Sequence, residues 1–254
     1  MQYPVYVISL AKDEERRNSL KKQFNSYNEF NIIDAVEGNK IDIQQYFKYL
    51  SGSLSKYNIL ISPNELGCTL SHIKAYEAFL ATDAEYCLIL EDDVLGNDEM
   101  IEQAFSLTNK VSKNSMIILG GIFNSVWGCK VVNDFYTVSK YALDKIYGAF
   151  AYVIDRECAK NLLAIQLDTG TVADAWYVLL PPNHINLYYS HLFQVDFDNI
   201  QSNIEIEREH KSLLGLNIKS LPTKGLTYYF SMAFLDKLIL KCRGKYIKFR
   251  KIYL

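Results

Sequence analysis

Apolar residues follow strand-like and helix-like spacings in turn along the first 190 residues of the chain. The segment YPVYVISL, residues 3–10, is β-branched and aromatic and ends at a polar break, which predicts a buried strand. Further strands are predicted at residues 30–38, 86–90 and 115–121, and a pair of strands at residues 134–142 and 147–155. Helices are predicted at residues 13–27, 42–49, 98–107, 156–165 and 173–180. This alternation predicts an α/β fold with a mostly parallel sheet flanked by helices.

The clearest helix boundary lies at SPNE, residues 62–65. Ser stands at the N-cap position, Pro at the first helical position, and Glu three residues after the cap. Two apolar stripes follow at about 100° per residue. The first contains Leu66, Leu70, Ile73 and Leu80, and the roughly opposite one contains Cys68, His72, Ala75 and Phe79. The pattern places His72 off the main core stripe, although a histidine buried on a second apolar face fits it as well.

Composition indicates an ordinary globular chain that can bury a core, with 49% apolar and 22% charged residues among 254. Its five cysteines are scattered without paired metal-ligand spacing, which favours a reduced protein. We see neither a secretory signal nor a run of roughly 18 apolar residues, and therefore expect a cytoplasmic protein.

Basic residues are concentrated at the end of the chain. Residues 235–254 hold seven of the 27 Lys and Arg but one of the 29 Asp and Glu, so the remainder carries a net charge of −8. Interleaved Leu, Ile, Tyr and Phe suit an anionic membrane surface, while a solvated terminal helix or a contact with nucleic acid would also explain the pattern. We expect a catalytic domain over residues 1–205 and a helical, basic extension over residues 206–254. The extension would bind the inner face of the cytoplasmic membrane, and no nucleic acid is expected as a partner.

Three adjacent carboxylates, Glu91, Asp92 and Asp93, follow the apolar strand YCLIL. Strand alternation sends Glu91 and Asp93 to one side and Asp92 to the other. In open α/β sheets ligands gather at the carboxyl ends of strands, and paired carboxylates there suit Mg²⁺ or Mn²⁺ bridging to a diphosphate. A solvated acidic turn, or the nucleophile and metal ligand of a phosphate-handling enzyme, are the other interpretations.

Six segments in order resemble glycosyltransferase family 25, whose bacterial members build lipooligosaccharide, often as β-galactosyltransferases. The resemblance spans roughly residues 3–205 and rests on VISLAKDEERR, FNIIDAVEG, ELGCTLSHIKAYE, LILEDDV, YGAFAYVIDRECAKNLL and TVADAWYVLL. It implies a GT-A-like, Rossmann-type fold and a UDP-sugar donor, with UDP-galactose as the first candidate. A lipid-linked oligosaccharide is the implied acceptor.

Position by position, the resemblance implies that Glu91 and Asp93 hold the metal. The residues it places at the nucleotide-sugar are Asp92, Ser9, Leu10, Arg17, Asp34, Ala35, Ser71 and His72. Those it places at the acceptor are Gly148, Gln194 and Ser202. For Arg17, pairing with Glu14 or Asp13 on its own helix is as good an explanation as a phosphate contact. A strand bulge would equally explain Gly148.

The resemblance also implies an inverting reaction, which needs a carboxylate to accept the acceptor's proton. Our candidate is Asp174, for which a helix N-cap or first-turn role is the alternative. Tyr147, Tyr152, Trp176 and Tyr177 are better explained as a buried aromatic cluster than as a sugar platform. The sequence thus predicts a metal-dependent hexosyltransferase. A catalytically silent sugar-binding scaffold of the same fold is the alternative.

Overall fold

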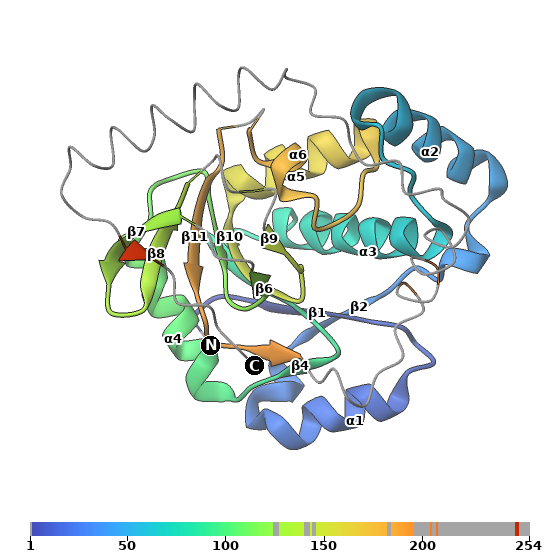
Figure 1. Ribbon diagram of the computed structural model, residues 1–254. Helices are drawn as coiled ribbons and strands as arrows, with labels where there is room; N and C mark the ends of the chain where they lie inside the picture. The colour runs from blue at the N-terminus through green and yellow to red at the C-terminus, as the bar shows by residue number, and fades with distance from the viewer. Residues whose placement is uncertain are drawn as a thin grey trace, which may run out of the picture.

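A nine-stranded sheet forms the centre of the molecule in the described part of the chain (Figure 1). The computed structural model describes residues 2–123, 127–139, 143, 146–181, 184–195, 204, 207 and 247–248. The strand order is β13-β7-β8-β11-β5-β10-β3-β1-β2. The strands are β1 (Val5–Ser9), β2 (Asn31–Asp34), β3 (Tyr86–Glu91), β5 (Ser115–Ile118), β7 (Trp127–Val132), β8 (Phe135–Val138), β10 (Ala151–Asp155), β11 (Asn186–Ser190) and β13 (Ile247–Lys248).

Six of the nine described strands run in one direction, which is the mostly parallel sheet that the sequence predicts, although five of the eight neighbouring pairs are antiparallel. β1 runs parallel to β2 and β3, and β5 runs parallel to β11. Among the described strands, β10, β8 and β13 run against the other six. Two short pairs lie beside this sheet, β4 (Val94–Leu95) with β12 (Gln194–Val195) and β6 (Ile122–Phe123) with β9 (Ile146–Tyr147).

The strands predicted at residues 134–142 and 147–155 are present as β8 and β10, but the prediction that they pair is wrong. β8 pairs with β7 and β11, whereas β10 lies between β3 and β5. Every residue of β10 is buried, because helices cover both faces of the sheet there. A strand of this kind reads as a continuous apolar run, which does not indicate its partners.

Helices cover both faces of the sheet (Figure 1). Val5 and Val7 of β1 pack in the cluster that contains α1 (Glu14–Gln23) and α4 (Asp98–Ser106). Tyr6 and Ile8 point the other way, into the cluster of α3 (Pro63–Leu80), α5 (Arg156–Thr169) and α6 (Trp176–Leu179). Further helices in the described part are α2 (Ile43–Tyr57) and the 3₁₀-helices Asn25–Glu29, Gly38–Lys40 and Leu107–Lys110. The side-chain alternation of β1 therefore determines which helix layer each residue contacts.

Helix α3 begins where the sequence predicts. The Ser62 hydroxyl accepts a hydrogen bond from the Glu65 N–H at 3.3 Å, and the Glu65 carboxylate accepts one from the Ser62 N–H at 2.8 Å. The predicted core stripe is only partly confirmed. Leu66 and Ile73 are buried, whereas Leu70 and Leu80 are half-buried. His72, Ala75 and Phe79 of the opposite stripe are buried as well. Because α3 packs against the sheet on one side and α5 on another, apolar residues are needed on more than one face.

Most of the basic extension lies outside the described residues. Glu207 is helical, but Ile247–Lys248 pair with β7 as a strand, so the helix expected at those two positions is wrong. The boundary near residue 205 stays a prediction. No helix within the described ranges has both the length and the apolar character needed to cross a membrane.

Candidate active site

The carboxyl ends of three parallel strands meet at one edge of the sheet. Ser9 ends β1, Asp34 ends β2 and Glu91 ends β3. The strand register pairs Ser9 with Asp34, and Ile8 with Glu91. Residues that lie far apart in the sequence therefore converge at the edge where α/β proteins bind ligands.

Alternation along β3 separates the first two acids. Ile89 faces the α3 layer and Leu90 the α1 layer, and the next two residues continue this order. Glu91 Oε1 lies 3.2 Å from His72 Nε2, whereas Asp92 Oδ1 accepts a hydrogen bond from Arg16 Nη1 at 2.9 Å. Burial raises the pKa of Asp92, and the hydrogen bonds from Ser9 and Arg16 oppose this. Asp92 thus has a structural partner, and its role toward a nucleotide stays a prediction.

Asp93 lies in the turn after β3 and has a buried oxygen, Oδ1, with no hydrogen-bond partner among the described residues. Burial and the neighbouring carboxylates of Glu91 and Asp92 raise its pKa to about 7. A buried carboxylate beside two others is costly unless a proton or a cation compensates. The donor set, two carboxylates with an unpartnered oxygen, therefore fits a hard divalent cation held by Glu91 and Asp93.

Arg17 binds the ends of β1 and β2. Its Nε donates to Ser9 Oγ at 3.0 Å, and its Nη2 donates to Ser9 O at 3.1 Å and to Asp34 Oδ1 at 3.0 Å. The Ala35 N–H also donates to Ser9 O at 2.9 Å, and Leu10 directly follows Ser9. The structure thus brings together all five of these predicted residues. Of the two explanations for Arg17, pairing with acids of its own helix is wrong, because its carboxylate partner is Asp34.

Ser71 connects α3 to the loop that follows β2. Its hydroxyl accepts from the Val36 N–H at 2.8 Å and donates to Gly67 O at 2.7 Å. A Cβ at Gly67 would lie 2.5 Å from Val36 O. The loop therefore lies directly on the helix backbone, and Ser71, which is buried, positions it.

His72 is buried, as the core interpretation predicts, and it is also a partner of the acidic turn. Its role toward a nucleotide-sugar stays a prediction. It is 1% exposed, and its Nδ1 lies 2.7 Å from the Tyr152 hydroxyl. Tyr152 in turn donates to the Tyr76 hydroxyl at 3.1 Å. Burial raises the pKa of both phenols, so each keeps its proton at neutral pH. The result is one chain of hydrogen-bonding groups from Tyr76 to Glu91.

A hydrogen bond joins Asp174 to Gly148, which lies two residues before the hydrogen-bond partner of the Glu91 backbone. Asp174 Oδ2 accepts from the Gly148 N–H at 3.1 Å, and the Glu91 N–H donates to Phe150 O at 2.8 Å. Gly148 has φ +98°, a conformation that favours glycine. Helix α6 begins only at Trp176 and has no side-chain cap. The prediction that Asp174 opens and caps this helix is therefore wrong, and its carboxylate holds the Gly148 backbone instead.

Comparison with known proteins identifies the family. The sequence profile of glycosyltransferase family 25 (LPS biosynthesis protein) matches residues 2–176. The chain belongs to glycosyltransferase family 25. This family 25 chain is 30% identical over 176 residues to lipooligosaccharide biosynthesis protein lic2B of Haemophilus influenzae, covering 63% of this chain and 62% of that protein.

Two further relatives of the family 25 chain come from eukaryotes. It is 32% identical over 99 residues to a glycosyltransferase 25 family member of Aedes aegypti, covering 35% of this chain and 16% of that protein. It is 24% identical over 115 residues to procollagen galactosyltransferase 2 of Homo sapiens, covering 43% and 18%. The chain thus spans less than two thirds of the length of these relatives and of lic2B.

Among solved structures, the family 25 chain is similar to a glycosyltransferase involved in the glycosylation of the major capsid of PBCV-1. The likeness has a TM-score of 0.41 and 12% identity, and covers 83% of this chain and 98% of that one. A TM-score below 0.5 does not establish a shared fold.

The predicted acceptor residues of the family 25 chain are only partly placed. Gln194 is exposed in β12, opposite Leu95 of β4, and so lies near the acidic turn. Ser202 lies outside the described residues. Tyr152 and Trp176 are fully buried in the core, as expected, whereas Tyr147 is exposed.

Two residues beside the site, Arg16 and Cys68, were not among the predicted site residues. Of the two adjacent arginines only Arg17 was predicted, although neighbouring arginines on one helix turn can bind two different partners. Cys68 precedes His72 by one helical turn, and its sulfur lies near both His72 and Glu91. The Cys-x-x-x-His spacing was the available signal.

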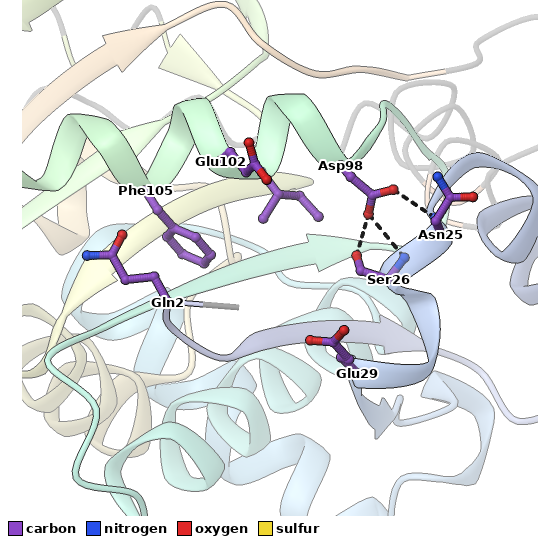
Figure 2. A pocket seen from close by; sticks show the side chains of 8 residues that line it. Gln2, Asn25, Ser26, Glu29, Asp98, Glu102 and Phe105 are labelled. Atoms are coloured by element: carbon purple, nitrogen blue, oxygen red, sulfur yellow. Dashed lines mark hydrogen bonds between the residues drawn. The ribbon is translucent and has the colours of Figure 1, made fainter.

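A cavity of about 580 Å³ lies elsewhere in the family 25 chain, near the start of β1 (Figure 2). In it, Asp98 accepts from the Asn25 N–H at 2.8 Å and from the Ser26 N–H at 3.2 Å. Burial alone would raise the pKa of Asp98, but the hydrogen bonds from Ser26 and Asn25 lower it. This carboxylate fixes the first 3₁₀-helix to α4, and the acidic turn is not part of the cavity. Its lining residues are Gln2, Asn25, Ser26, Glu29, Asp98, Ile101, Glu102 and Phe105.

Proposed function

We propose that this family 25 chain is a divalent-cation-dependent, inverting glycosyltransferase with a GT-A-like fold. It would move a hexose, with galactose as the first candidate, from a UDP-sugar to a lipooligosaccharide or another glycan. The observation that carries the proposal is Asp93, whose buried Oδ1 has no hydrogen-bond partner among the described residues, next to Glu91 at the carboxyl edge of the sheet. The names of lic2B and procollagen galactosyltransferase 2 support the acceptor class and the sugar.

Glu91 and Asp93 would hold Mn²⁺ or Mg²⁺. When bound, the cation would stabilise the negative charge that grows on the diphosphate as the bond to the sugar breaks. Arg17 lies at the same edge, with its guanidinium between Ser9 and the exposed Asp34. A phosphate that displaced the Asp34 carboxylate would gain the charge-assisted hydrogen bond that Asp34 now accepts.

Asp174 is the proposed general base. Its Oδ2 is fixed by the Gly148 N–H, and no hydrogen bond from a described residue reaches its Oδ1. That oxygen is therefore available to accept the proton of an acceptor hydroxyl. Gly148, which lacks a side chain, would let the sugar approach the backbone beside Glu91.

Release of UDP from a panel of UDP-sugars, with Mn²⁺ or with EDTA, tests this function. We expect slow Mn²⁺-dependent release with a preferred hexose, stimulated by a glycan acceptor and lost in Asp93→Asn. Asp83→Asn, which changes an exposed carboxylate in a distant turn, is the matched control. Absence of turnover with every UDP-sugar would favour the silent sugar-binding scaffold.

We further propose that residues 235–254 bring the enzyme to the inner face of the cytoplasmic membrane. Seven basic residues near an anionic surface would each contribute about 1 kcal/mol. Co-sedimentation with phosphatidylglycerol vesicles, compared with phosphatidylcholine vesicles and with a chain that ends at residue 234, tests it. Equal sedimentation of the two chains with anionic vesicles would contradict this role.

A further inference from the structure

Three potential metal ligands of different chemical kinds converge beside the acidic turn. Cys68 and His72 lie one turn apart on α3, and Glu91 ends β3. One ligand atom from each residue lies within 4.8 Å of the other two. Cys68 and Glu91 are half-buried and His72 is buried, so the cluster is partly protected from solvent but still accessible to it.

The hydrogen bonds of His72 indicate which ring nitrogen carries the proton. The single hydroxyl proton of Tyr152 is donated to Tyr76, so Tyr152 must accept a hydrogen bond from His72 Nδ1–H. The lone pair of a neutral His72 then lies on Nε2. It points at Glu91 Oε1 from 3.2 Å, which is repulsive unless a proton or a metal cation lies between the two atoms.

We propose that Cys68 Sγ, His72 Nε2 and Glu91 Oε1 bind Zn²⁺ or a transition metal of similar preference, with a fourth position open to water or substrate. A tetrahedral metal bound by imidazole nitrogen and carboxylate oxygen separates those two atoms by about 3.3–3.5 Å. The observed 3.2 Å is already close to that value. Metal-binding histidines also typically donate from their other nitrogen, as Nδ1 does here to Tyr152.

The ligand set distinguishes this site from the proposed oxygen site of Glu91 and Asp93. Thiolate and imidazole select Zn²⁺ over Mg²⁺, and carboxylate oxygens favour Mg²⁺ and Mn²⁺. Three protein ligands with one open position are also typical of catalytic rather than structural zinc. The inference goes beyond the proposed function, because that reaction requires only the oxygen site. Glu91, with two oxygens, belongs to both.

Cobalt titration of the full chain tests the site directly. The background variant Cys129→Ser/Cys242→Ser removes one exposed thiol and one in the basic extension, so that these do not contribute. We expect one equivalent of Co²⁺ to produce a thiolate-to-cobalt charge-transfer band that Zn²⁺ abolishes. Adding Cys68→Ser should remove the band, whereas adding Asp93→Asn should leave it. A band that survives Cys68→Ser, or no band at all, would overturn the proposal.

Zinc affinity in Tyr152→Phe is the second measurement. This change keeps the ring and removes the acceptor for His72 Nδ1–H. The affinity for Zn²⁺, measured in competition with a chromophoric chelator, should therefore fall by roughly 10–100-fold. An unchanged affinity would contradict Nε2 as a ligand. Because neither measurement uses turnover, failure of this site and failure of the glycosyl transfer proposal can be told apart.

Discussion

Arg16 of α1 and Asp92 of the acidic turn form a hydrogen-bonded ion pair across 76 residues of sequence, with Nη1 and Oδ1 2.9 Å apart. The pair keeps Asp92 on the α1 side of the sheet. Glu91 and Asp93 are the two acids that we propose hold a cation at the carboxyl edge. Arg16 also opposes the rise in the pKa of Asp93. One arginine thus separates an acid with a charged structural partner from the two acids proposed to hold the cation.

Arg16→Gln should destabilise the protein, because Asp92 stays buried without its charged partner. We expect the free energy of unfolding to fall by about 1–3 kcal/mol at pH 7. Urea unfolding measures this. Lys22→Gln, an exposed change on the same helix, should stay within about 0.5 kcal/mol of the wild type. Equal stability of Arg16→Gln and wild type would show that the ion pair contributes nothing.

The stability of the cation-free protein should depend on Asp93 between pH 4 and 7. Its folded-state pKa is about 7, raised from the usual 3.8, so the folded state binds the proton more tightly than the unfolded state. Its contribution is fully present below pH 3.8 and is lost as the pH rises to about 7. Asp93→Asn should remove this part of the pH dependence, and Mn²⁺ should stabilise the wild type above pH 7 but not the variant. Urea unfolding from pH 4 to 8 measures both effects. If the wild type and Asp93→Asn had the same dependence of stability on pH, the raised pKa would not belong to Asp93.

Asp174→Asn should lower the turnover rate and leave donor binding unchanged. The asparagine oxygen can still accept the Gly148 N–H, so thermal stability and UDP affinity should stay near wild type. Turnover should fall by about 10²–10⁴-fold, as for loss of a general base. Steady-state kinetics together with a thermal melt check this. Activity close to wild type would eliminate Asp174 as the base.

Gly67→Ala has two opposing effects on stability, one from helix propensity and one from close packing. Alanine within a helix is favoured by about 1 kcal/mol over glycine. The added Cβ would lie 2.5 Å from Val36 O, however, and would push the loop after β2 away from α3. We expect a net loss of about 1–3 kcal/mol in the free energy of unfolding and weaker UDP binding. A variant more stable than wild type would contradict the described contact.

Local sequence signals predicted the parts of the fold that local chemistry determines. The Ser62 and Glu65 side chains satisfy the backbone N–H groups of Glu65 and Ser62, so four residues were enough to predict the start of α3. Alternation along β3 likewise predicted that Glu91 and Asp92 point to opposite sides. Both signals act within a few residues.

Features that depend on distant partners could not be predicted in this way. The position of β10 between β3 and β5 depends on pairing across the whole chain. The buried face of α3 was misjudged because a second layer, α5, packs on it. The capping role considered for Asp174 was wrong for the same reason, since its carboxylate accepts a hydrogen bond from Gly148 and not from its own helix.

Calorimetric titration of UDP at pH 8, with Mn²⁺ or with EDTA, tests the central claim most directly, because Asp93 should be ionised there. If Glu91 and Asp93 hold a cation that binds a diphosphate, Mn²⁺ should tighten UDP binding by about tenfold or more in wild type and in Asp83→Asn. The affinity of Asp93→Asn for UDP should not respond to Mn²⁺. Equal UDP affinity of the wild type with and without Mn²⁺, or an unchanged Mn²⁺ response in Asp93→Asn, would contradict the account.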